Sequence, residues 1–197
     1  MTCARYCRRV QPVRIGLFGG TFCPPHNGHV AALAAAWETG WFDQLLVTVV
    51  GDPYHKEGTD LLPAPVRLAM AHAAFDPLPG AVVTDSEIVR GGPTYTVDTV
   101  RELVADGHRV TVIVGADAAV NLDEWHDAAA LVSLATIAIV PRTGCAPTVG
   151  ARWRAVEIPM DPVDLSSTHI RRGTDSPEVL AASIPVAALS IFLDARG

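Results

Sequence analysis

Two glycines and two histidines near the N-terminus form the pattern in this chain that is best suited to chemistry. The run reads Gly19-Gly20-Thr21-Phe22-Cys23-Pro24-Pro25-His26-Asn27-Gly28-His29. The apolar residues 13–18 before it predict a short buried strand, and residues 31–37, rich in alanine, predict a helix. Glycines let the backbone approach a ligand, and the first turn of a helix offers N–H groups to an anion. We therefore expect a phosphate site in which the rings of His26 and His29, three residues apart, lie on one side.

Two later clusters are suited to binding phosphate. Lys56, in the polar turn 51–56, is the only lysine beside fourteen arginines, and its compact ammonium suits a phosphate. Three hydroxyls precede a short predicted helix that has an arginine in its first turn, which makes a second possible phosphate clamp: Ser166, Ser167, Thr168 and Arg171. Plainer interpretations remain, because a lone loop lysine is usually solvated and hydroxyls often do no more than cap a helix.

Two other clusters are suited to a nucleoside. Tyr95 and Thr96 lie in the run 90–99, where a glycine-rich turn leads into a predicted helix. Asp117 follows an apolar strand and suits ribose hydroxyls, and Trp125, eight residues later, offers a flat face to an aromatic ring. The plainer alternatives are a threonine-capped helix and a tryptophan that serves only in packing.

The elements that must position these residues alternate between apolar strands and amphipathic helices. Predicted strands cover 13–18, 44–50, 81–89, 108–114 and 134–140, with a weaker sixth near 153–158, and predicted helices cover 31–37, 65–75, 94–105 and 185–195. This alternation predicts an α/β, Rossmann-like fold: a parallel sheet of five to six strands with helices on both faces. Ligands of such sheets bind at the carboxyl ends of the strands, where the polar clusters fall. We expect residues 1–12 to form a disordered tail and residues 13–197 to form one domain.

Composition narrows the possible functions. The formal net charge of −6 argues against a nucleic-acid partner, because such proteins usually carry a basic surface. No apolar run approaches the roughly 20 residues that span a bilayer, so no membrane partner is expected. The four cysteines form no C-x-x-C pair, which favours a reducing, cytoplasmic location.

The full spacing G-G-T-F-x-P-P-H-x-G-H resembles the signature of the nucleotidyltransferase superfamily of Rossmann-like adenylyltransferases. Residues 165–171 look like the I-S-S-T-x-I-R motif of the same superfamily, with leucine in the leading position. Three weaker features resemble its bacterial nicotinate-mononucleotide branch: the loop that ends at Lys56, the run 90–99, and the spacing from Asp117 to Trp125. The motifs extend, in family order, from the first strand to the final helix.

This resemblance implies a function and a set of roles. The function is adenylyl transfer from ATP to nicotinate mononucleotide, which gives deamido-NAD and pyrophosphate. The implied catalytic residues are His26, His29, Lys56 and Arg171; the ATP-binding residues are Gly19, Gly20, Thr21, Phe22, Ser166, Ser167 and Thr168; and the mononucleotide-binding residues are Tyr95, Thr96, Asp117 and Trp125. Mg²⁺ is expected to arrive with ATP, bound through its phosphates, so the protein itself needs no metal site.

Cys23 is the position at which the leading motif departs from the family, which usually has aspartate there. A thiol is a weak hydrogen-bond acceptor, so we expect it to fill the space without anchoring the loop. Two alternatives therefore stay open beside the main interpretation. One is the same chemistry on another acceptor, such as nicotinamide mononucleotide or phosphopantetheine. The other is a nucleotide-binding relative that is not catalytic. The sequence leaves the oligomeric state open.

Overall fold

A computed structural model describes residues 11–51, 61–145, 149–172 and 176–196. The segment that contains Lys56 lies outside the described residues, as does nearly all of the expected N-terminal tail. Six strands form one parallel sheet: β1 (Arg14–Gly20), β2 (Gln44–Val49), β3 (Ala81–Thr84), β4 (Arg109–Gly115), β5 (Ala135–Val140) and β6 (Ala155–Glu157). Their order in the sheet is β3-β2-β1-β4-β5-β6, so the predicted Rossmann-like class is confirmed.

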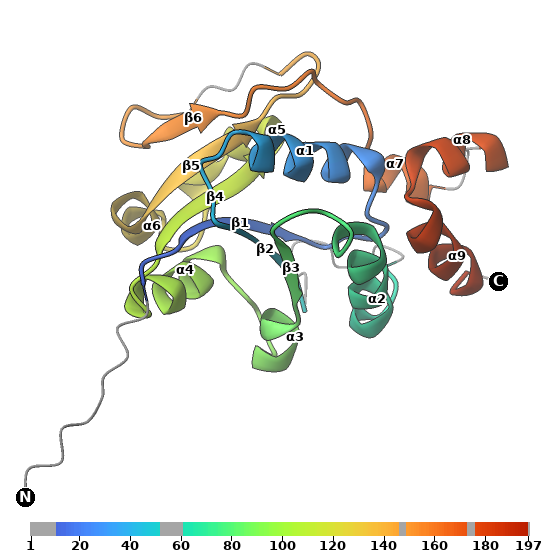
Figure 1. Ribbon diagram of the computed structural model, residues 1–197, viewed down its shortest axis with the longest axis horizontal. Coiled ribbons are helices and arrows are strands. Elements are labelled where there is room, and N and C mark those ends of the chain that lie inside the picture. The colour runs from blue at the N-terminus through green and yellow to red at the C-terminus, as the bar shows by residue number, and fades with distance from the viewer. Residues whose placement is uncertain (1–10, 52–60, 146–148, 173–175, 197) are drawn as a thin grey trace, which may run out of the picture.

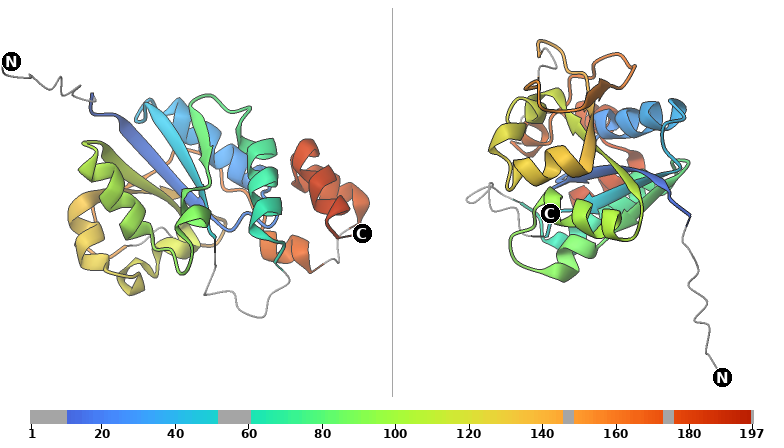
Figure 2. Two further views of the ribbon diagram at one scale, coloured as in Figure 1. Left: turned by 90° about the horizontal axis from the view of Figure 1, so that it is seen from below. Right: turned by 90° about the vertical axis from the view of Figure 1, so that its left-hand side faces the viewer.

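Helices connect the strands and lie on both sides of the sheet (Figure 1). The longer ones are α1 (Asn27–Glu38), α2 (Ala64–Phe75), α4 (Thr96–Ala105), α6 (Ala128–Leu134), α8 (Pro177–Ser183) and α9 (Val186–Asp194). Shorter ones are α3 (Ser86–Arg90), α5 (Ala116–Ala119) and α7 (Ser167–Arg171), with a 3-10 turn, η2 (Leu122–Glu124). Figure 2 shows α9 beside α2 at one end of the molecule, where Phe192 and Met70 belong to one buried cluster.

Two buried clusters pack against the opposite faces of the sheet. Neighbouring residues of β1 belong to different clusters. Phe18 packs in the cluster with α1, α2 and α9, and Leu17 packs in the cluster with α4 and α6. In β4, Ile113 lies in the first cluster and Val112 in the second. The strands are apolar at consecutive positions because side chains on both faces are covered. That coverage fixes the register of β1 and β4, whose carboxyl ends carry the polar clusters.

One predicted strand is too long. Residues 81–89 were expected to be extended, but β3 ends at Thr84 and α3 follows it. The hydroxyl of Thr84 accepts a hydrogen bond from the backbone N–H of Ser86 at 3.2 Å, and this local bond replaces a ladder bond. The helical turn then buries Glu87 beside two threonine hydroxyls, partners that an exposed edge strand would not give it.

Nothing in the described part of the chain is a helix long and apolar enough to cross a bilayer.

Gly80, just before β3, is a position where no other residue fits. Its φ is +71°, and an added Cβ would lie 1.9 Å from a ring carbon of Trp37. Gly40 has nearly the same φ, +69°, but an added Cβ there meets no atom within 4 Å. We expect Gly80→Ala to lower the free energy of unfolding by about 3 kcal/mol or more, and Gly40→Ala by about 1 kcal/mol, because only the first adds overlap to backbone strain. Urea denaturation of both variants measures this, and equal losses would contradict the packing argument.

Candidate active site

A cavity among the described residues lies where the chain order of the strands reverses, between β1 and β4. It has a volume of about 340 Å³ and is lined at its base by the carboxyl ends of three strands: Phe18 and Gly19 of β1, Ile113, Val114 and Gly115 of β4, and Val140 of β5. The start of α1 lies on one side, and the residues that lead into α7 lie beside it. This is the switch point at which open α/β sheets bind nucleotides.

His26 and His29 form a stacked pair at the start of α1. Their ring centroids are 3.6 Å apart, so the expectation that both rings lie on one side is confirmed. Nδ1 of His29 accepts the backbone N–H of His26 at 3.1 Å, and Nδ1 of His26 accepts the backbone N–H of His29 at 3.3 Å. Because each Nδ1 accepts, the neutral form of each imidazole carries its proton on Nε2. The pair therefore caps the helix and sets its own tautomers.

The environment of each histidine is specific. Phe22 contacts the His29 ring edge-on, with centroids 5.3 Å apart. His26 is 7 % exposed, and burial, together with the positive charge of Arg142, lowers its pKa to about 4. His26 is thus neutral at physiological pH, in the state that its hydrogen bond to the helix requires.

Side chains of α7 bind the loop that leads into α1. Ser167 donates to the carbonyl oxygen of Pro24 at 2.8 Å, and Arg171 donates to the carbonyl oxygen of Cys23 at the same distance. Arg171 also donates to the hydroxyl of Thr168 at 3.2 Å. The two motifs, almost 150 residues apart in sequence, are therefore joined directly.

Arg67 of α2 also binds this loop. It is 2 % exposed, and it donates to four backbone carbonyls, those of Thr21, Val50, Gly51 and Leu62, at 2.6–3.0 Å. Burial lowers its pKa. One planar guanidinium thus joins the glycine loop, the end of β2 and the entry to α2.

Cys23 does more than fill space, so that expectation is wrong. Its side chain is completely buried, and its sulfur accepts the backbone N–H of Leu62 at 3.3 Å. The carbonyl of Leu62 accepts from Arg67, so the thiol and the guanidinium hold two sides of one residue. The thiol therefore anchors the loop, though through a weaker acceptor than a carboxylate.

The other wall of the cavity carries an ion pair and an indole. Asp117 of α5 pairs with Arg142, which follows β5, at 2.8 Å, and Trp125 is half-buried just after η2. Tyr95, the residue before α4, stacks on His126 with centroids 4.0 Å apart. Tyr95 thus contacts His126, the residue that follows Trp125 in the chain.

The structure brings most of the predicted site residues together. The cavity wall includes Gly19, Phe22, His26, His29, Asp117, Trp125, Ser166, Ser167 and Thr168. Among the described residues it does not include Gly20, Thr21, Tyr95, Thr96 or Arg171. Gly20 is needed for packing, because an added Cβ would lie 2.7 Å from the Phe22 ring. Thr21 and Arg171 take part through the loop hydrogen bonds described above.

Two site residues were missed in the sequence. Arg142 follows a predicted strand, and the strand-end rule that selected Asp117 applies equally to it. Arg67 gave no such signal, since it lies in the first turn of an alanine-rich helix and not at a strand end. The described residues contain no group of three or more histidine, cysteine or acidic side chains placed to hold a metal ion.

The fold and a family match define the class of enzyme. The parallel sheet and its strand order fit a nucleotidyltransferase, and residues 17–173 match the family model described as cytidylyltransferase-like.

Comparison with known proteins defines the branch. The chain is 42 % identical over 161 residues to a protein from Albidiferax ferrireducens named probable nicotinate-nucleotide adenylyltransferase, covering 81 % of this chain and 75 % of that one. It is 34 % identical to a protein of the same name from Thermus thermophilus, covering 94 % and 98 %. The chain belongs to the family of nicotinate-nucleotide adenylyltransferases.

A solved structure shares the fold at low identity. The nicotinic acid mononucleotide adenylyltransferase of Plasmodium falciparum, complexed with APC, superposes with a TM-score of 0.72 at 15 % identity, covering 93 % of this chain and 96 % of that chain.

The low pKa of His26 predicts a pH dependence of stability. The folded-state pKa, about 4, lies below the ordinary value of 6.5, so the unfolded chain binds more protons between these values. The contribution of neutral His26 to the free energy of unfolding is complete above pH ~6.5 and is lost as the pH falls towards ~4. Between pH ~6.5 and ~4, we expect the free energy of unfolding of wild type to fall by up to about 3 kcal/mol more than that of His26→Asn. Urea denaturation at several pH values measures this difference. Asparagine keeps a capping acceptor without titrating. Parallel curves for the two proteins would contradict this prediction.

Proposed function

We propose that this protein transfers the adenylyl group of ATP to nicotinate mononucleotide, giving deamido-NAD and pyrophosphate. The observation that supports this most strongly is one cavity with two different walls. The histidine pair at the start of α1 and the hydroxyls at the start of α7 form a wall suited to phosphates, and Asp117 and Trp125 form a wall suited to a nucleoside. The identity to the named relatives over most of the chain is independent support.

The reaction needs alignment more than covalent chemistry. An oxygen of the mononucleotide phosphate attacks the α-phosphorus of ATP, one P–O bond forms, and the bond to the β-phosphate bridging oxygen breaks. The electron pair of that bond leaves with pyrophosphate. His29 donates from Nε2 to an α-phosphate oxygen, because its Nδ1 is already occupied by the N–H of His26. The hydrogen bond at Nδ1 places the donated proton on Nε2 before ATP binds.

Pyrophosphate leaves on the side of the α7 start. The hydroxyls of Ser166 and Thr168 would bind the β- and γ-phosphates there, beside Ser167, and Arg171 would neutralise them. Lys56, by resemblance, has the same role, and it lies outside the described residues. ATP binding has to redirect Arg171, whose guanidinium contacts the Cys23 carbonyl.

Mg²⁺ supplies charge neutralisation for the triphosphate when it is bound. The donor set fits an ion held mainly by phosphates and water, since the acidic residue on the cavity wall, Asp117, is already paired with Arg142.

The mononucleotide occupies the other wall. Trp125 stacks on the pyridine ring, and Asp117 binds a ribose hydroxyl. The loop at Tyr95 and Thr96 closes that side, because Tyr95 is already stacked against the neighbour of Trp125. ATP as a substrate and a buried thiol at Cys23 are consistent with a cytoplasmic location.

The acceptor is tested by following pyrophosphate release from purified protein with ATP and Mg²⁺. We expect turnover with nicotinate mononucleotide to exceed turnover with nicotinamide mononucleotide or phosphopantetheine by about 100-fold or more in kcat/KM, since a buried polar site rejects an unmatched group strongly. His29→Ala should lower kcat by about 100-fold, the usual cost of one transition-state donor. A higher kcat/KM with another acceptor would contradict the proposal and identify that acceptor as the substrate. ATP binding without any turnover would establish the non-catalytic alternative.

Cys23 gives a second test of the same site. Aspartate at this position would accept the Leu62 N–H more strongly and would place a negative charge near the buried guanidinium of Arg67. We expect Cys23→Asp to raise kcat by about threefold to tenfold with little change in the KM for ATP, because a firmer loop loses less energy in aligning the substrates. Cys23→Ser, which keeps a neutral acceptor of similar size, is the matched control and should remain near wild type. An aspartate variant no faster than the serine variant would show that the charge is not needed.

A further inference from the structure

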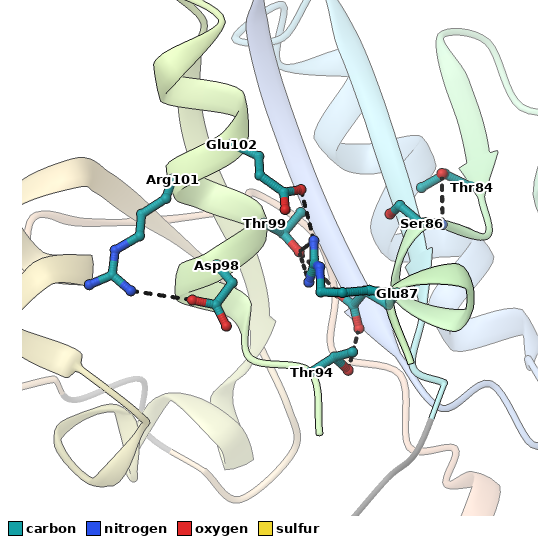
Figure 3. A network of polar contacts seen from close by, with 9 residues as sticks. Thr84, Ser86, Glu87, Thr94, Asp98, Thr99, Arg101 and Glu102 are labelled. Carbon is teal, nitrogen blue, oxygen red and sulfur yellow. Dashed lines mark hydrogen bonds and ion pairs between the residues drawn. The ribbon is translucent and has the colours of Figure 1, made fainter. Parts of the chain in front are cut away.

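A buried carboxylate lies behind the loop that was assigned to the mononucleotide. Glu87 of α3 is 5 % exposed, and its two oxygens accept hydrogen bonds from two buried hydroxyls. Thr94 donates to one oxygen at 3.0 Å, and Thr99 of α4 donates to the other at 3.4 Å. Figure 3 shows Glu87 between these two threonines, with α4 on one side and α3 on the other. None of the three residues lines the cavity, so this carboxylate is not explained by substrate contact.

The carboxylate is itself held in place from two directions. The backbone of α3 packs so closely on the end of β2 that a Cβ added to Gly51 would lie 2.9 Å from the carbonyl oxygen of Glu87. On the other side, Arg90 donates to the Thr99 hydroxyl at 3.4 Å and forms an ion pair with Glu102 at 2.8 Å. A buried carboxylate with fixed partners is expensive to leave unpaired, so the network favours one geometry of the chain between α3 and α4.

That geometry reaches the cavity through one aromatic contact. Thr94 immediately precedes Tyr95, and Tyr95 stacks on His126 at 4.0 Å between centroids. His126 immediately follows Trp125, which lines the cavity. One hydrogen bond, one ring stack and two peptide linkages therefore connect Glu87, through Thr94 and the Tyr95–His126 stack, to the indole wall.

We propose that Glu87 is a positioning residue for the mononucleotide half of the site. It holds Thr94 and the start of α4, and it thereby sets the position of Tyr95 and of the Trp125 wall. It touches no substrate. The wall formed by the His26–His29 pair and the start of α7 shares none of these contacts. We therefore expect loss of the carboxylate to weaken the binding of the mononucleotide and to leave the binding of ATP unchanged. The kinetic part of this inference rests on the proposed function, because it assigns the Trp125 wall to the acceptor.

The experiment compares three variants by steady-state pyrophosphate release, varying each substrate at saturation of the other. Glu87→Ala should raise the KM for nicotinate mononucleotide by about tenfold, the equivalent of one lost charged hydrogen bond, with the KM for ATP and kcat within about threefold of wild type. Glu87→Gln can still bond both hydroxyls, because a threonine hydroxyl accepts as well as donates, and should recover most of the loss. Glu102→Ala is the matched control: its carboxylate binds Arg90 on the exposed side of the same network, and both KM values should stay within about twofold.

A second measurement does not depend on turnover. Amide hydrogen exchange of the ligand-free proteins should be faster over residues 93–99 in Glu87→Ala than in wild type, with residues 26–33 of α1 unchanged. Should Glu87→Ala fail to fold, Glu87→Gln decides, with a rise of about twofold to threefold in the mononucleotide KM alone. Equal rises in both KM values, or unchanged exchange over 93–99, would overturn the inference. Absence of turnover in wild type would instead count against the proposed function, and the exchange comparison would still decide whether Glu87 holds the loop.

Discussion

The loop between β1 and α1 has backbone carbonyls that neither the sheet nor the helix can satisfy, and the site depends on how they are bonded. Arg67 binds the Thr21 carbonyl, Arg171 binds that of Cys23, and Ser167 binds that of Pro24. A buried carbonyl left without a donor costs about 1–3 kcal/mol, so each of the three side chains stabilises the loop in the ligand-free protein. The position of the histidine pair follows from this, since His26 comes directly after that loop.

These three donors come from parts of the chain that only the folded sheet brings together. Arg67 lies on α2, which packs on β2, whereas Ser167 and Arg171 lie on α7 after the last strand. α2 and α7 both contribute side chains to one buried cluster, among them Met70 and Ile170, and the register of β1 against β2 and β4 fixes where the loop begins. The phosphate site is thus a product of the whole sheet, which explains why its motifs are widely separated in sequence.

The features that were predictable from the sequence are those that depend on hydrophobic periodicity and on the residues at strand ends. Apolar runs located the strands, and glycines and histidines after β1 located the cavity, because both signals are local. The end of β3 was not predictable, since it depends on Glu87 finding two threonines 7 and 12 residues later. Arg67 could not be recognised either: its four acceptors lie 5 to 46 residues away and are backbone atoms, which leave no pattern of side-chain types. The anchoring by Cys23 was missed for the same reason, as its partner is the N–H of Leu62.

The two conspicuous motif residues of α7 therefore have a second task in the ligand-free protein. Arg171 and Ser167 hold the loop carbonyls, and under the proposed function an incoming triphosphate would compete with those carbonyls for the same donors. A phosphate oxygen is the stronger acceptor because it is charged, so ATP can displace the carbonyls, provided that the loop keeps its shape without them. Arg67 and Cys23 are not part of the described cavity wall, so they can keep the loop fixed during this exchange. In the proposed mechanism, Arg171 and Ser167 are released to the substrate, whereas Arg67 keeps its bonds to the loop. This explains why a buried arginine binds the glycine loop although its described hydrogen-bond partners include no carboxylate.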